Sequence, residues 1–444
     1  MFSFLINSIF PEKAFFWGFA EKISRSITGP ISLIFVAIFL DLKSQGYLFT
    51  FISLLTIKFV LELGLTQIII TFVAYEKNSL SFHKFFLKGK FNSYLRLKNI
   101  SRYSIHWFFW ASIIYILIIN LIGYFLFSNS GDPISYWLYP FLLLCLFSSI
   151  EIFFIPFYAI KEGLAEIEKV YKFKFFKTIF FLLAYLTFLS IGAGLWSFSI
   201  AYFFNIFIDI IFIFKSRVFF YSIYRNAKVN KIRLNWKKEI FPLQTKIAIG
   251  AVSGILSFSI FTPFSFSLLG PEVAGKVGLT LAIVTGISTL SVVPSLISSQ
   301  RIASLVEKKE IKKLNHLIFR LLSISIIIHL ISLAGLILFF FFLKSSFPFI
   351  LDKVVDPISF LYFFFAMMLS LISSPFSIFM RAHKEEPLMW LSVFTGVAIS
   401  LSCYFGMYYN GAMGAAIAYF IITLISFPIL LKIFFDFKSR YKLN

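Results

Sequence analysis

The sequence predicts an all-α polytopic membrane protein with about twelve transmembrane helices, arranged as two parallel-repeat six-helix lobes around a central cavity. The first observation is composition: 59% of the residues are hydrophobic, 20% are aromatic and only 14% are charged. A water-facing surface needs more charged residues. The second is a series of apolar stretches of about 20 residues or more, long enough at about 1.5 Å per residue to cross a bilayer. The third is the distribution of positive charge between them.

Lysine and arginine residues gather on alternate connections between the apolar stretches. Of the 41 Lys and Arg residues, 36 lie on the even-numbered connections and the termini, four lie on the odd-numbered connections, and Lys58 lies inside a strongly apolar stretch. Short connections rich in Lys and Arg stay on the cytoplasmic side during insertion. We therefore expect a multi-pass protein of the bacterial inner membrane, with both termini in the cytoplasm.

The apolar stretches divide into two groups of six, separated by a basic segment. That segment carries nine Lys or Arg residues against one acidic residue, Glu239. We predict an inner-surface segment over 1–23, a first lobe over 24–214, a cytoplasmic linker over 215–246, a second lobe over 247–431 and a cytoplasmic tail over 432–444. The predicted spans are 24–41, 46–74, 104–127, 135–160, 173–191, 196–214, 247–269, 274–300, 316–343, 357–380, 388–408 and 411–431.

The net charge of +21 has a membrane explanation. In a soluble protein it would suggest nucleic-acid binding, but here it is the sum of the positive-inside bias and contact with anionic lipid. We expect membrane lipids and no nucleic acid as partners. Cys145 and Cys403 lie in apolar stretches without metal-ligand neighbours, which predicts reduced packing residues. We expect no metal site.

The two halves share sequence patterns in the same order. Leu40–Gly46 (LDLKSQG) matches Leu269–Gly275 (LGPEVAG), and Gly194–Tyr202 (GLWSFSIAY) matches Gly411–Tyr419 (GAMGAAIAY). The first and seventh spans cross in the same direction, so the repeat is parallel, and transporters place substrates where two such lobes meet. Four glycines at the outside connections are predicted to allow tight turns and close helix contact. They are Gly192, Gly194, Gly411 and Gly414.

Four stretches carry a likeness to a known family: Gly29–Glu76, Glu162–Ile179, Ser267–Ser291 and Asn410–Tyr419. With them the chain resembles the Wzx-type O-antigen and polysaccharide flippases, the oligosaccharide branch of the multidrug/oligosaccharidyl-lipid/polysaccharide exporter superfamily. The resemblance implies a flippase that moves undecaprenyl-diphosphate-linked O-antigen or capsule repeat units from the cytoplasmic to the periplasmic leaflet by alternating access. It also implies a role in lipopolysaccharide or polysaccharide biosynthesis, with the polymerase and chain-length regulator of the same pathway as partners.

Two other functions stay open. A drug or cation antiporter of the same superfamily would share the architecture. A polysaccharide polymerase is a less favoured alternative, because such an enzyme needs a sizeable outside loop and the longest here runs only over 344–356. We therefore expect a transporter and no catalytic residues.

Lys58 and Glu62 are charged residues inside the second predicted span. Each charge costs roughly 2.5–3.5 kcal/mol at a helix centre, so it should face a cavity or a partner. Four residues apart, they are close enough to pair on one helix face. They are either a self-neutralising pair that helps the helix insert, or a substrate site in which Lys58 binds a phosphate or acidic sugar and Glu62 holds it in place.

Arg25 begins the first predicted span, beside Ser24 and Ser26 and ahead of an expected break at Gly29-Pro30. A guanidinium presents a planar fork of donors that suits a diphosphate. The flippase resemblance also favours cationic residues on the first helices, so Arg25 is a substrate-binding candidate. The alternative is a positive-inside anchor that reaches the lipid headgroups.

Further polar residues lie inside other spans. Glu151 precedes Pro156, and Asp209 follows Asn205 at helical spacing, so either carboxylate is a candidate for binding H⁺ or Na⁺ during transport. No other cofactor is expected. Asn205 and His329 are additional cavity candidates, although such residues more often form hydrogen bonds between helices.

Overall fold

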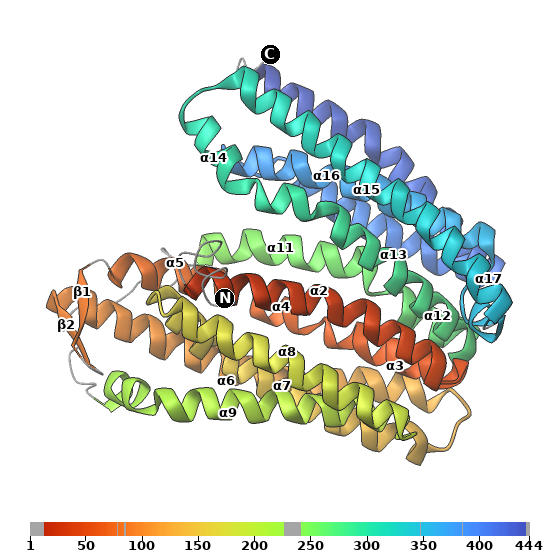
Figure 1. Ribbon diagram of the computed structural model, residues 1–444, viewed down its shortest axis with the longest axis horizontal. Helices are drawn as coiled ribbons and strands as arrows, with labels where there is room; N and C mark the ends of the chain where they lie inside the picture. Colours follow the sequence, from red (N-terminus) through yellow and green to blue (C-terminus); the bar gives the residue numbers. More distant parts are fainter. Residues whose placement is uncertain are drawn as a thin grey trace, which may run out of the picture. The chain divides into compact units, whose positions relative to one another are not determined.

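A computed structural model describes residues 13–77, 79–83, 86–225, 241–346, 348–383 and 385–440 (Figure 1). Within these ranges eleven helices are long and apolar enough to cross a membrane. The last, α17 (Met389–Arg440), contains two helices joined at Asn410 and Gly411, whose backbone angles are not helical. It therefore holds the eleventh and twelfth predicted spans, and the prediction of a multi-pass helical membrane protein is confirmed.

The first half of the chain is helical apart from one short hairpin. Strands β1 (Leu80–His83) and β2 (Phe86–Gly89) pair antiparallel. The sequence gives no signal for this hairpin, because strands of four residues are too short to produce a clear alternating pattern. The helices are α2 (Lys13–Phe39), α3 (Leu42–Leu55), α4 (Lys58–Glu62), α5 (Leu65–Lys77), α6 (Phe91–Ser128), α7 (Ile134–Gly163), α8 (Ile167–Ser190) and α9 (Trp196–Arg225).

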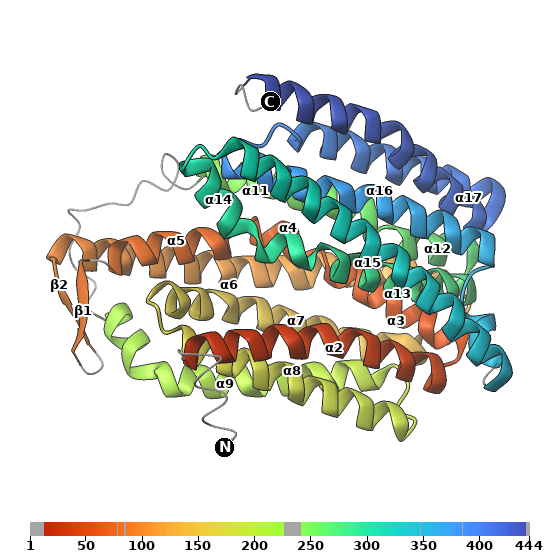
Figure 2. The same ribbon diagram turned by 45° about the horizontal axis from the view of Figure 1, so that its top comes forward.

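The second half continues as helices, with one turn of 3-10 helix. In Figure 2, α15, α16 and α17 run side by side, and each contacts its neighbour. The elements are α11 (Phe241–Phe258), α12 (Phe261–Leu269), α13 (Pro271–Ile297), α14 (Ser299–Glu307), α15 (Ile311–Ser346), the 3-10 turn η1 (Pro348–Lys353), α16 (Pro357–Ala382) and α17.

Some predicted segments extend the helices or fall outside the described residues. Residues 1–12 of the predicted surface segment, 226–240 of the linker and 441–444 of the tail lie outside them. The flanking parts of those segments belong to α2, α9, α11 and α17. The expected break at Gly29-Pro30 was wrong, since α2 continues through Pro30. One missing amide donor does not end a helix whose neighbouring turns keep their hydrogen bonds.

The contacts divide the chain into two compact units. One comprises Met1–Phe35 and Leu54–Ala251, and the other comprises Val36–Ser53 and Val252–Asn444. In the first unit α7 packs against α5, α6, α8 and α9. Its core contains Phe127, Trp137 and Phe141, whose rings meet at 5.3 Å. This core fixes the helices that carry the charged residues described below.

The second unit has its own aromatic core around Phe261, Phe363 and Tyr419. It includes α3, which the sequence assigns to the first lobe. A Cβ on Gly46 would lie 1.8 Å from the carbonyl oxygen of Pro271, and one on Gly275 would lie 2.4 Å from that of Leu42. Only glycine allows two helix backbones to approach this closely. The repeat-related segments LDLKSQG and LGPEVAG thus contact each other.

The predicted roles of the outside glycines are confirmed. Gly192, Gly194 and Gly411 have φ of 83°, 55° and 59°, which glycine adopts without steric strain. Gly414 packs on Gly406, where a Cβ would lie 1.9 Å from a carbonyl oxygen. Gly194 and Gly411, paired in the sequence repeat, share the same left-handed φ.

Candidate functional site

The second predicted span is broken where its charged residues lie. The expected single helix over 46–74 was wrong: α3 ends at Leu55, α4 holds only five residues, and α5 begins at Leu65. Leu63 and Gly64 between α4 and α5 have φ of 50° and 64°. The indole Nε1 of Trp107 donates to the carbonyl oxygen of Leu61 at 3.2 Å, which satisfies one group that the break frees. Lys58, the first residue of α4, lies within ion-pair distance of α7.

Four charged side chains form an alternating chain across four helices of the first unit. Lys58 on α4 lies 3.0 Å from Glu151 on α7, and Glu151 lies 2.8 Å from Lys177 on α8. Lys177 lies 2.8 Å from Asp209 on α9, whose other oxygen accepts a 2.7 Å hydrogen bond from the hydroxyl of Tyr158. With two cations and two carboxylates, the chain is neutral as a whole. Neutrality is what makes such a cluster tolerable inside a helical bundle.

Exposure distinguishes the members of this chain. The side chains of Lys58, Glu151 and Lys177 are 20%, 17% and 18% exposed. That of Asp209 is fully buried. Three of the charged side chains are therefore partly exposed, whereas that of Asp209 has no exposed surface.

The accessible charges open into a cavity of about 440 Å³. Its wall holds equal numbers of cationic and acidic side chains, together with aromatic rings. Two buried polar atoms of lining residues have no hydrogen-bond partner among the described residues. They are the carboxamide oxygen of Asn205 and the hydroxyl oxygen of Thr66. The charged wall residues are Arg25, Lys58, Lys174 and Lys177 against Glu62, Glu151, Glu162 and Asp209.

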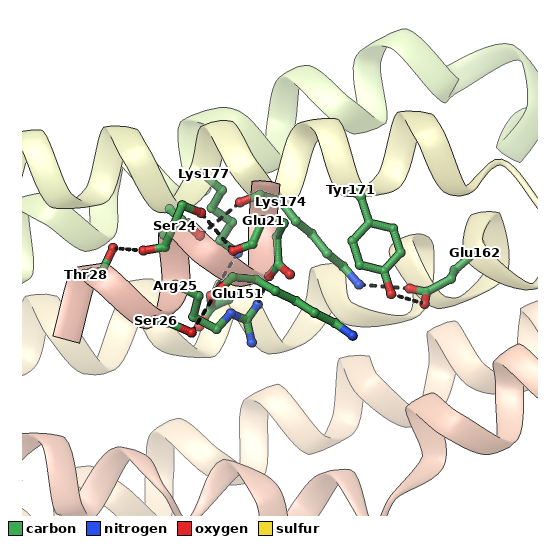
Figure 3. A network of polar contacts seen from close by, with 12 residues as sticks. Glu21, Ser24, Arg25, Ser26, Thr28, Glu151, Glu162, Tyr171, Lys174 and Lys177 are labelled. Atoms are coloured by element: carbon green, nitrogen blue, oxygen red, sulfur yellow. Dashed lines mark hydrogen bonds and ion pairs between the residues drawn. The ribbon is translucent and has the colours of Figure 1, made fainter. Parts of the chain in front are cut away.

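Two further ion pairs lie beside these four charged side chains (Figure 3). Lys174 on α8 lies 2.9 Å from Glu162 on α7, which also accepts a 3.1 Å hydrogen bond from the hydroxyl of Tyr171. Arg25 lies 2.5 Å from Glu21, one turn earlier on α2. The Arg25 side chain is 71% exposed, so part of its donor fork stays available.

The structure brings most of the predicted site residues into this one cavity. Arg25, Glu62, Asn205 and both ion-coupling candidates line it with Lys58. The expected Lys58–Glu62 pair does not form: Lys58 pairs with Glu151, and Glu62 makes no ion pair with any described residue. Both residues lie on α4, so helical spacing relates them, but it did not predict that the partner of the lysine would come from α7.

His329 does not belong to this cavity. It lies in the second unit on α15, fully buried. Its Nε2 lies 3.3 Å from the carbonyl oxygen of Phe364, and its Nδ1 lies 3.4 Å from the hydroxyl of Ser291. The ring centroids of His329 and Phe364 are 4.1 Å apart. These contacts join α15 to α13 and α16, which is the packing role that the sequence left open.

Lys174 and Lys177 are among the charged site residues that sequence reasoning missed, as is Glu162. The two lysines lie at the start of the predicted span 173–191, directly after Lys169 and Lys172, in a stretch of mixed basic and aromatic residues. Tyr171, Lys174 and Thr178 recur at helical spacing on α8, and all contact or line the site. That spacing could have indicated a polar face on this helix, although it does not predict which residues those side chains contact.

No group of three or more His, Cys, Asp or Glu side chains among the described residues is arranged to hold a metal ion. Cys145 and Cys403 are buried free cysteines, as predicted. The chemistry available at the site is therefore that of ammonium, guanidinium and carboxylate groups around a small cavity.

No protein-family model and no curated protein matches the sequence. Solved structures do match. An inward-facing multidrug resistance MATE family transporter of the MOP superfamily is 14% identical with a TM-score of 0.64, covering 94% of this chain and 96% of its own. The lipid II flippase MurJ in an inward closed conformation is 17% identical with a TM-score of 0.58, covering 97% and 91%.

A third match is a MOP superfamily transporter from Pyrococcus furiosus, described as having a binding pocket of reverse polarity. It is 12% identical with a TM-score of 0.55, and the alignment covers 96% of this chain and 94% of the other. Sequence identities this low carry the fold and no more. The chain therefore has the fold of the MOP superfamily transporters.

Proposed function

We propose that this protein is a flippase that moves an anionic, lipid-linked oligosaccharide from the cytoplasmic to the periplasmic leaflet of the bacterial inner membrane by alternating access. The observation that supports this most is the cavity of the first unit, in which Lys58, Lys174, Lys177 and Arg25 meet. Buried or half-buried cations inside a helical bundle are expensive and mark substrate or ion pathways. A phosphate or diphosphate group is the ligand that such donors bind best.

Two independent likenesses agree with this assignment. The sequence resembles the Wzx-type flippases, and one structural neighbour is a lipid II flippase. On this basis the substrate is an undecaprenyl-diphosphate-linked O-antigen or capsule repeat unit, with both termini of the protein in the cytoplasm. Arg25 and Lys58 contact the phosphates, and Glu62 holds Lys58 in place. Glu151 or Asp209 binds the coupling H⁺ or Na⁺.

A drug or cation antiporter is the second candidate. One structural neighbour is a multidrug resistance transporter, and the cavity wall has as many carboxylates as cations. A cationic drug would bind Glu62 and Glu162, whereas an anionic lipid would bind the opposite set. The two functions therefore predict substrates of opposite charge.

Reconstituted vesicles distinguish them. The protein is purified and inserted into liposomes with a prenyl-diphosphate-linked oligosaccharide that carries a fluorescent group on the sugar, and a membrane-impermeant reductant is added outside. In empty vesicles about half of the label is protected, and with the protein nearly all should be quenched. Fluorescent phosphatidylcholine serves as the control lipid and should stay protected. Protection of the diphosphate lipid, combined with uptake of a cationic dye, would instead favour the antiporter.

A further inference from the structure

We infer that the Glu151 carboxylate is a built-in counter-anion: the phosphate group of the substrate displaces it from Lys58 and Lys177, and Glu151 takes up one proton when it is displaced. This inference rests on the proposed transport of an anionic lipid. The inference goes further by stating how the charge of the site changes when substrate binds. Neither the fold nor the similarity to known flippases specifies that change.

The geometry around Glu151 is that of an occupied anion site. Each of its two oxygens accepts from a different ammonium, Oε2 from Lys58 at 3.0 Å and Oε1 from Lys177 at 2.8 Å. Two oxygens of a phosphate accept from lysine ammoniums at similar distances. Because all three side chains are partly exposed and line the cavity, a ligand there reaches the ammoniums from the same side.

Asp209, unlike Glu151, stays paired with Lys177 when a ligand enters the cavity. It is fully buried, and its two oxygens accept from Lys177 and Tyr158. Since the side chain of Asp209 has no exposed surface, a ligand in the cavity displaces the partly exposed Glu151 and leaves Asp209 in place. Lys177 therefore keeps one counter-ion when Glu151 is displaced, whereas Lys58, which pairs with Glu151, is released. Without Glu151, the charges of Lys58, Lys177 and Asp209 sum to one positive charge.

Displacement leaves Glu151 without its cations inside the bundle. It would then stand beside the phosphate and Asp209, and an ionised carboxylate in that position costs several kcal/mol. Uptake of one proton removes that cost. Binding one phosphate group with a single negative charge together with one proton leaves the sum over these four side chains and that phosphate neutral, as the four side chains were before binding. The charged and titratable groups around Glu151 are Arg25 on α2, Lys58 and Glu62 on α4, Tyr115 on α6, Tyr158 and Glu162 on α7, Lys174 and Lys177 on α8, and Tyr202 and Asp209 on α9.

The chain contains a matched control for Glu151. Glu166 also bridges two lysines, with Lys161 at 2.6 Å and Lys169 at 2.9 Å, and its side chain is 16% exposed against 17% for Glu151. It lies between α7 and α8 and does not line the cavity. Although burial disfavours its charge, hydrogen bonds from Lys161 and Lys169 hold the pKa of Glu166 below its ordinary value. Glu166→Gln removes a bridging carboxylate without touching the proposed site.

The test is calorimetric binding to the full-length protein in lipid nanodiscs between pH 6 and 8. The probe is a short-chain prenyl diphosphoryl sugar, because its diester phosphates stay ionised over this range. Titration in two buffers with different ionisation enthalpies counts the protons. We expect about one proton taken up per probe bound, and an affinity that falls about tenfold for each unit of pH, as linkage requires.

Glu151→Gln should bind the probe with no proton uptake and no pH dependence, and more tightly than the unaltered protein at pH 8. Glu166→Gln should behave like the unaltered protein. Binding without proton uptake, or a Glu151→Gln variant that keeps the pH dependence, would overturn this inference and leave the flippase proposal standing. No binding of the probe by the unaltered protein at any pH would contradict the flippase proposal itself. The proton count needs no variant, so the inference can fail even if Glu151→Gln does not fold.

Discussion

Replacing Lys177 with methionine should destabilise the protein more than any other single charge removal on α8. Lys177 lies 2.8 Å from both Glu151 and Asp209. At that separation and an effective dielectric constant of about 20, each attraction is roughly 6 kcal/mol before desolvation is subtracted. Removing one partner of a buried ion pair costs about 3–5 kcal/mol, because the remaining charge stays buried without compensation. We expect a loss of that size for Lys177→Met.

Lys174→Met is the matched control, one helical turn away. Lys174 and its partner Glu162 are 28% and 17% exposed, and Glu162 keeps the hydroxyl of Tyr171 as a donor. A more solvated pair contributes about 1 kcal/mol or less. The two lysine variants should therefore differ by at least about 2 kcal/mol, although both lose the same charge from the same helix.

A second substitution should rescue the first. Lys177→Met combined with Asp209→Asn removes one positive and one negative charge, leaves Lys58 paired with Glu151, and lets the hydroxyl of Tyr158 donate to the new amide oxygen. The double variant should recover most of the lost stability. The assay is equilibrium unfolding in one fixed detergent. If Lys177→Met costs no more than Lys174→Met, or if the double variant is less stable than Lys177→Met, the charge argument is wrong.

Three further predictions concern topology and packing. In intact cells a single cysteine at Ser130 should react with an impermeant thiol reagent and one at Lys309 should not; reversed labelling would contradict the positive-inside orientation. Gly406→Ala should lower stability by a few kcal/mol, because its Cβ would lie 2.5 Å from a carbonyl oxygen. Gly335→Ala, where no atom lies within 4 Å, should be neutral or stabilising by up to about 1 kcal/mol, as thermal unfolding would show. Trp107→Phe removes the donor to the carbonyl at the break after α4 and should cost about 1 kcal/mol; unchanged stability would mean that another group satisfies that carbonyl.

The spans could be predicted because hydropathy is a local property. A segment such as Trp196–Tyr221 has to be helical and apolar wherever its neighbours lie, since a bilayer leaves no other way to satisfy the backbone. The outside turns at Gly192, Gly194 and Gly411 were also local, because a left-handed φ needs glycine at that position. The sequence by itself therefore determined most of the membrane-spanning helices and several of the turns between them, but not the breaks within the second span.

The pairing of charges was decided only by the tertiary structure. Lys58 meets Glu151 across 93 residues of chain and Lys177 meets Asp209 across 32, so no helical spacing relates them. Local spacing favoured Lys58 with Glu62 instead, and although both lie on α4, the lysine pairs with Glu151 on α7. An ion pair inside a bundle forms between whichever side chains the packed helices bring within reach, because an unpaired charge there is too costly to leave. The sequence could say that each buried charge needs a partner, but only the packing of α4, α7, α8 and α9 could say which one.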